Sequence, residues 1–170
     1  DPEGTDQTYC KVDVALATAQ SLLVGPEDEV YVVSARPPTS GVWRYTDLPT
    51  SADAAGGCGD TDATGAPLAD SVTREQVLAP GEHDILSPAG IAPAPDGGYY
   101  LSSVITGVIN EYDADWGFVR TILAPPAGEA IGTDTSLSTG TPLGIGVTPD
   151  GTIYYADIGI VNDPEDGFGP

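Results

Sequence analysis

The chain has 170 residues and a formal net charge of −21, because 26 aspartates and glutamates oppose only 5 lysines and arginines. Binding to nucleic-acid phosphates or to anionic lipid headgroups needs clusters of basic side chains, so this composition excludes a nucleic-acid binder and argues against a membrane-surface protein. No apolar run reaches the roughly 18 residues that a membrane-spanning helix needs.

Residue usage indicates an exported protein. Methionine is absent, and the two cysteines, Cys10 and Cys58, lack the spacing of a metal site or a redox motif. We therefore expect an extracellular or periplasmic chain whose signal peptide has been removed, with an excised fragment of a longer protein as the alternative. In an oxidising compartment we expect one disulfide between Cys10 and Cys58, and buried free thiols are the other interpretation.

One turn-and-strand pattern occurs three times, over residues 25–34, 94–103 and 148–157. Each copy joins a proline and an acidic residue to a run of β-branched and aromatic residues. Proline fixes φ at the first turn position, and Asp or Gly permits the tight reversal. Each copy therefore predicts a hairpin turn that leads into a strand.

The pattern extends on both sides of the turns. Upstream, residues 88–92 match residues 142–146, and downstream, residues 40–45 match residues 106–112. A further strand is predicted over residues 118–123. The chain thus predicts an all-β fold of about three four-stranded antiparallel meanders, which are the blades of a β-propeller.

These units form a single partial propeller domain over residues 1–170. We expect the units at approximately 12–49, 86–124 and 142–170, with long loops over 46–85 and 124–141. A strand is expected at 73–78 inside the first loop, where a short helix over 71–78 is the alternative.

Three blades cannot close a ring, because propellers typically use four to eight. Three explanations remain open. The chain is part of a longer propeller, or two copies complete a six-bladed ring with residues 9–16 supplying strands in trans. Otherwise the repeat misleads, and the fold is a sandwich-like all-β domain.

Tyrosines recur at one place in each copy of the pattern: Tyr31, then Tyr99 and Tyr100, then Tyr154 and Tyr155. Side chains alternate between the two faces of a strand. One member of each pair should therefore face the core between two sheets, and its neighbour should face the other surface of its sheet.

The segments 88–103 and 142–157 resemble those of NHL-repeat propellers and of the related SMP-30/gluconolactonase-like and strictosidine-synthase-like propellers, of the six-bladed type. The resemblance implies that the strand over 88–92 lines a central channel. Lactone-hydrolysing members hold a divalent cation through Glu, Asn and Asp, commonly with an asparagine before the glycine of that strand. Ala89 and Leu143 stand at those positions here and cannot coordinate a metal.

Asp157 occupies the aspartate position of NHL-type repeats. We expect it to cap a loop by accepting backbone N–H bonds, with a role in a site as the alternative. His83, the only histidine, lies beside Asp84 and is a candidate general base; an ordinary loop histidine is the other interpretation.

Asp60 and Asp62 open an acidic loop with oxygen ligands at alternate positions, which resembles the start of a calcium loop. Ser71 stands where such a loop needs a bidentate glutamate, so a solvated acidic loop is the alternative. No other cofactor is predicted.

Three functions are consistent with the sequence. The first is a secreted acidic propeller that acts as an interaction or assembly module, or as one part of a larger propeller, with a protein partner, the remaining propeller segment or a homodimer. The second is a calcium-dependent hydrolase of the lactonase or esterase type. The third is a scaffold subunit of an exported redox complex. The sequence leaves open whether the chain is an enzyme.

Overall fold

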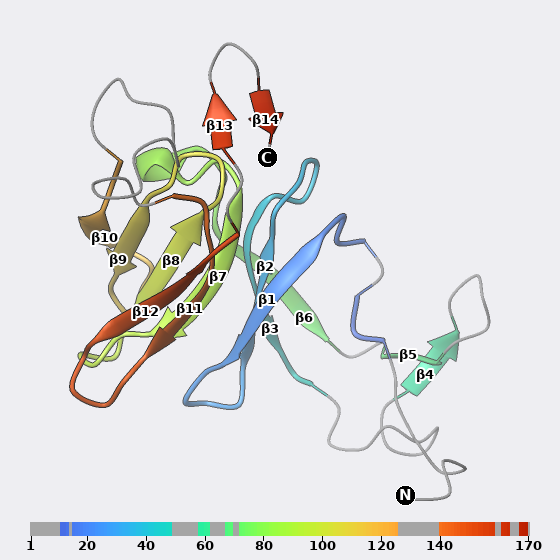
Figure 1. The fold of residues 1–170 in the computed structure, drawn as a ribbon. Helices are drawn as coiled ribbons and strands as arrows, with labels where there is room; N and C mark the ends of the chain where they lie inside the picture. Colours follow the sequence, from blue (N-terminus) through green and yellow to red (C-terminus); the bar gives the residue numbers. More distant parts are fainter. Residues whose placement is uncertain are drawn as a thin grey trace, which may run out of the picture.

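The computed structural model describes residues 11–13, 15–48, 58–61, 67–69, 72–125, 140–158, 161–163 and 167–169. The described residues are all-β, as predicted, and a 3₁₀ turn, η1 (Glu82–Asp84), is their single helical segment. Two four-stranded antiparallel sheets and three two-stranded pairs make up the fold (Figure 1).

The first sheet contains β1 (Ala19–Val24), β2 (Val30–Ser34), β3 (Gly41–Thr46) and β6 (Thr73–Leu78), hydrogen-bonded in that order. β2 consists of β-branched and aromatic residues up to its final serine, and such residues favour the extended backbone. β6 confirms the strand, rather than the helix, inside the predicted loop over 46–85. The first sheet therefore takes its fourth strand from across that insertion.

The second sheet is a meander of four consecutive strands: β7 (Pro88–Pro93), β8 (Tyr99–Ser103), β9 (Ile109–Tyr112) and β10 (Phe118–Leu123). Its β7–β8 turn is the second copy of the repeated pattern. Gly97 at this turn and Gly151 at the third copy have φ of 93° and 86°. This left-handed conformation is open to glycine without steric cost, which explains the glycine after the turn aspartate in these two copies. In the first copy Asp28 adopts it, with φ 63°.

The third sheet has two strands, β11 (Pro142–Val147) and β12 (Ile153–Asp157). The described residues of the unit expected over 142–170 form this two-stranded sheet and one further pair of strands. β13 (Val161–Asp163) pairs with β14 (Gly167–Gly169) in a separate hairpin. The last residues are rich in Gly, Asp and Pro, which favour turns over a continuous ladder. β4 (Cys58–Thr61) and β5 (Pro67–Ala69) form another hairpin.

The sheets stack with their first strands adjacent. β7 contacts β1 on one side and β11 on the other, so the second sheet is the middle layer (Figure 1). Two apolar cores result. Buried residues between the first and second sheets are Tyr31, Val33, Val42, Leu78, Ile85, Ile91, Tyr99, Leu101, Val108, Tyr112 and Trp116. The core between the second and third sheets contains Ala94, Tyr100, Ile109, Ile122, Ile145, Val147 and Ile153.

The paired tyrosines of β8 divide between these cores. Tyr99 packs on the Tyr31 ring at 5.0 Å between centroids and stacks on Trp116 at 4.6 Å, and its hydroxyl lies 3.0 Å from that of Tyr31. Burial, followed by this hydrogen bond, raises the pKa of Tyr99. Tyr100 points the other way, into the core with the third sheet. The predicted alternation is therefore confirmed for this pair.

Candidate functional site

His83 and Asp157, the two catalytic candidates, both make structural contacts. His83 lies in η1 at φ 49°, and its ring stacks on Phe118 with centroids 3.8 Å apart and planes 9° apart. Its carbonyl accepts a hydrogen bond of 2.7 Å from Asn110 Nδ2. These contacts hold η1 against β9 and β10, as expected of a loop histidine.

Asp157 ends β12 beside the start of β11. Its Oδ1 accepts hydrogen bonds from the Thr141 backbone N–H, at 3.2 Å, and from the Thr141 hydroxyl, at 3.1 Å. The backbone bond is the one expected of a loop cap. It ties the connection before β11 to the end of β12.

The predicted calcium site and disulfide fall outside the described residues. Asp62 and Cys10 are not described, and Asp60 and Cys58 lie in β4, of which only the backbone is described. Elsewhere in the described part of the chain, no group of three or more His, Cys, Asp or Glu side chains is placed to hold a metal ion.

The strongest candidate for a functional surface is the outer face of the third sheet, opposite the core. Ile145, Val147 and Ile153 pack inward against the second sheet. Strand alternation and the β11–β12 register place four residues on the outer face: Gly144, Gly146, Tyr154 and Ala156.

One tyrosine position distinguishes this face from its counterparts on the other sheets. The strand register makes Tyr31, Tyr100 and Tyr154 equivalent: each pairs with the same position of its first strand, occupied by Leu23, Ala92 and Gly146 respectively. Tyr31 and Tyr100 face the next sheet along the chain and are 3% and 5% exposed, whereas Tyr154 is 64% exposed. The third sheet thus exposes a tyrosine at a position where the equivalent tyrosines of the other two sheets are buried.

Gly90 and Gly144, which occupy equivalent positions in the second and third sheets, also differ in whether another strand covers them. A Cβ added to Gly90 would lie 2.5 Å from the Leu143 carbonyl oxygen, because β11 runs directly against β7 there. The Ser102 hydroxyl bridges this contact: it accepts the Gly90 N–H at 2.8 Å and donates to the Leu143 carbonyl at 3.3 Å. At Gly144, the matching residue of the third sheet, a Cβ would meet nothing within 4 Å. Among the described residues, no strand therefore runs against β11 at Gly144 as β11 runs against β7 at Gly90.

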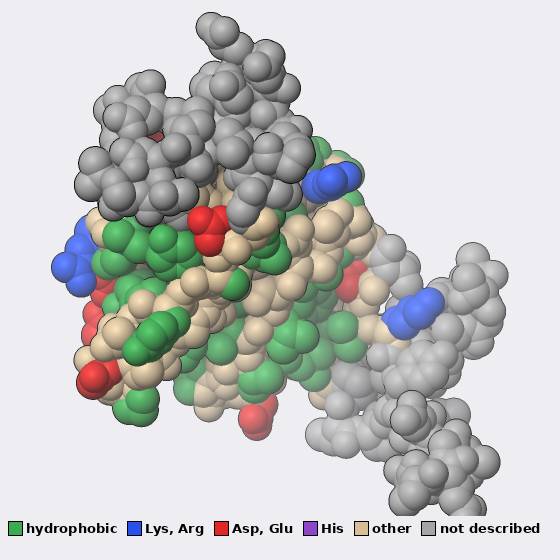
Figure 2. All heavy atoms as spheres, viewed as in Figure 1, with side chains coloured by type: hydrophobic (Ala, Val, Ile, Leu, Met, Phe, Trp, Pro, Cys, Tyr) green, Lys and Arg blue, Asp and Glu red, His purple; other side chains and the backbone are tan. Residues whose placement is uncertain are grey.

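The outer face of the first sheet is also apolar. Leu22 and Val24 on β1 are 64% and 60% exposed. The residues that match Leu22 in the other sheets, Ile91 and Ile145, pack against the sheet that precedes them in the chain. Figure 2 shows hydrophobic side chains gathered in this view over β1 and beside the β11–β12 hairpin.

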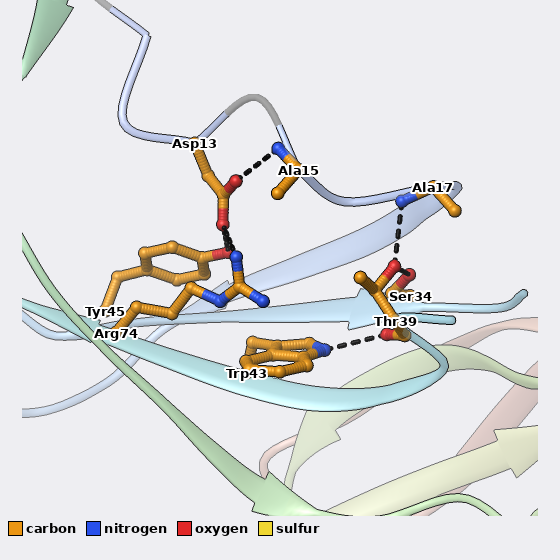
Figure 3. Close-up of polar contacts among 8 residues, drawn as sticks. All are labelled: Asp13, Ala15, Ala17, Ser34, Thr39, Trp43, Tyr45 and Arg74. Carbon is orange, nitrogen blue, oxygen red and sulfur yellow. Dashed lines mark hydrogen bonds and ion pairs between the residues drawn. The ribbon is translucent and has the colours of Figure 1, made fainter. Parts of the chain in front are cut away.

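Another part of this outer face is covered by the described residues of the N-terminal segment, 11–13 and 15–17 (Figure 3). Asp13 accepts hydrogen bonds from the Tyr45 hydroxyl at 2.6 Å and from Arg74 at 2.8 Å. The Arg74 guanidinium lies 3.9 Å from the centroid of the Trp43 ring. The described part of this segment therefore lies on the first sheet of its own chain.

The charges in this contact depend on one another. Partial burial of Asp13 favours the neutral acid, but hydrogen bonds from Tyr45, from the Ala15 N–H and from Arg74 outweigh it and lower the pKa of Asp13. Burial, followed by the Asp13 carboxylate, raises the pKa of Tyr45. No motif in the sequence predicted this contact, since its members come from three separate segments.

Comparison with known proteins identifies no family. A scan against protein-family models found none that matches the chain, and a search of curated proteins found no match either. In the described residues, no helix has the length and apolar character needed to cross a membrane.

Proposed function

We propose that this chain is an assembly module of the β-propeller type, whose third sheet receives a further β-sheet of the same repeat on its outer face. The observation that carries the proposal is Tyr154, which is 64% exposed at the position where Tyr31 and Tyr100 are buried by the next sheet.

An exposed apolar face gains free energy when a partner removes it from water. Burial of a large apolar side chain is worth roughly 1.5–3 kcal/mol. The neighbouring Gly144 and Gly146 have no side chains, so an incoming strand can approach the backbone as closely as β11 approaches Gly90. Exposed apolar patches on protein surfaces commonly mark interaction sites.

The proposal includes an exported location, extracellular or periplasmic, and a protein partner. Its support is compositional: a strongly acidic chain with two cysteines outside any metal or redox motif. A disulfide between Cys10 and Cys58 is part of the proposal, and thiol titration of the unfolded protein with and without reductant tests it.

Sedimentation velocity tests the assembly. We expect the wild-type chain to self-associate as its concentration rises and Tyr154→Lys to sediment as a monomer. Lysine is chosen because it reduces the net negative charge, so a loss of association cannot be attributed to added repulsion. Val119→Lys, at an exposed position on the outermost strand β10, is the matched control and should behave as wild type. A wild-type chain that is monomeric at every concentration and unfolds cooperatively would contradict the proposal.

A further inference from the structure

We infer that the sheet received by the third sheet is the first sheet of a second copy of this chain, docked head to tail so that β1 of one copy lies against the β11–β12 hairpin of the other. The inference rests on the proposed function and names its partner. One chain carries both halves of an interface that already occurs within it.

The internal interface between the second and third sheets defines what each half must provide. The second sheet supplies a tyrosine, Tyr100, and a glycine, Gly90. The backbone of β11 runs directly against this glycine. The third sheet supplies two aliphatic side chains on its first strand, Ile145 and Val147, which pack in the same core as Tyr100.

The receiving half is repeated on the outer face of the third sheet. Tyr154 stands at the position of Tyr100, and Gly144 at that of Gly90. Tyr154 is largely exposed, and the space over Gly144 is open.

The inserting half is repeated on the outer face of the first sheet. The β1–β2 register places Leu22 at the position of Ile145 and Val24 at that of Val147. Both side chains are mostly exposed. The described residues Asp13 and Ala17 of the N-terminal segment hydrogen-bond elsewhere, to Tyr45, Arg74 and Thr39.

The two free faces differ, so the contact between copies is heterologous. Such a contact closes into a ring where the rotation permits and otherwise continues as an open chain of copies. Two copies would bring six stacked sheets together, which lies within the four to eight blades of closed propellers. The net charge of −21 on each copy opposes the association, so the experiment is done at high salt, where the repulsion is screened.

Complementation between two variants tests the inference. Leu22→Lys damages only the inserting face, and Tyr154→Lys damages only the receiving face. In a head-to-tail contact each variant alone joins a damaged face to an intact one, so each should sediment as a monomer. An equal mixture retains one fully intact pairing, and we expect it to form a one-to-one heterodimer that cannot grow further. A mixture of Val119→Lys with wild type should assemble as wild type does.

The other outcomes overturn either the head-to-tail contact or the proposed function. If Leu22→Lys assembles alone as wild type does, the partner of the third sheet is not the first sheet of a second copy, and the proposed assembly through Tyr154 still stands. A mixture that stays monomeric also overturns the head-to-tail contact. If wild type itself is monomeric, the proposed function fails as well. Circular dichroism confirms that the variants are folded, and Val24→Lys and Ala156→Lys replace on the same faces any variant that is not.

Discussion

At the scale of single residues, two glycines with the same place in the repeat have opposite surroundings. Gly90 is in contact with the backbone of β11, whereas no described residue lies within 4 Å of a Cβ placed on Gly144. A backbone carbonyl cannot move aside as a flexible side chain can, so the absence of a Cβ at residue 90 sets how closely two sheets stack.

These glycines give a matched pair of substitutions. Gly90→Ala should lower the free energy of unfolding by about 1–3 kcal/mol, because the added methyl group forces the second and third sheets apart. Gly144→Ala should change it by less than about 0.5 kcal/mol, as is usual for surface substitutions. Urea denaturation measures both, with Tyr154→Lys as the background so that association does not contribute. Equal effects at the two positions would contradict the close contact between Gly90 and the β11 backbone.

A residue's role could be predicted from the sequence where its own strand determines that role. The alternation of Tyr99 and Tyr100 follows from adjacent positions on β8 and needed no tertiary information. The contacts of His83 could not be anticipated, because Phe118 and Asn110 reach it from two strands that come later in the chain.

At the scale of elements, local patterns located most strands but did not decide how they pair. β7 to β10 follow their turns closely, so chain order and sheet order coincide. β6 joins β3 across a long insertion, and its sequence alone permitted a helix or a strand. The described residues after β12 form β13 and β14, which pair with each other and extend no neighbouring sheet.

The Asp13 carboxylate joins the N-terminal segment to β3 and β6. Asp13→Asn should lower the free energy of unfolding at neutral pH by about 1–2 kcal/mol, since the hydrogen bonds from Tyr45 and Arg74 lose their charged acceptor. The pKa of Asp13 is lowered in the folded chain, so its contribution is present above the ordinary carboxyl pKa and is lost as the pH falls through the folded value.

Chemical denaturation at several pH values measures this contribution. The difference in stability between wild type and Asp13→Asn should be constant near neutrality, begin to fall below about pH 4, where aspartate in the unfolded chain takes up its proton, and vanish once the pH is below the lowered pKa of the folded chain. Hydrogen exchange at the amides of Ala15 and Ala17 should quicken in the variant. A difference that stays the same at low pH would contradict the role given to the Asp13 charge.

At the scale of the whole molecule, charge and apolar surface act in opposite directions. Self-repulsion among 26 carboxylates disfavours the compact chain and its association, whereas the exposed faces at β1 and β11–β12 favour association. The composition alone argues against some classes of partner, but it could not show the apolar faces, because these arise only when the strands are paired and stacked.

Salt therefore separates the effect of charge from that of a specific ion. We expect the melting temperature to rise with sodium chloride, because the Debye length falls from about 30 Å at 0.01 M to about 3 Å at 1 M and repulsion is screened. Calcium chloride at equal ionic strength should raise it further if the sequence prediction at Asp60 and Asp62 is correct, since a bound cation stabilises the folded chain by mass action. Asp60→Asn combined with Asp62→Asn should then remove the additional rise and keep the response to sodium chloride. Equal melting temperatures in the two salts would contradict the calcium hypothesis. A melting temperature that falls with sodium chloride would show that attraction between charges, rather than repulsion, dominates the folded chain.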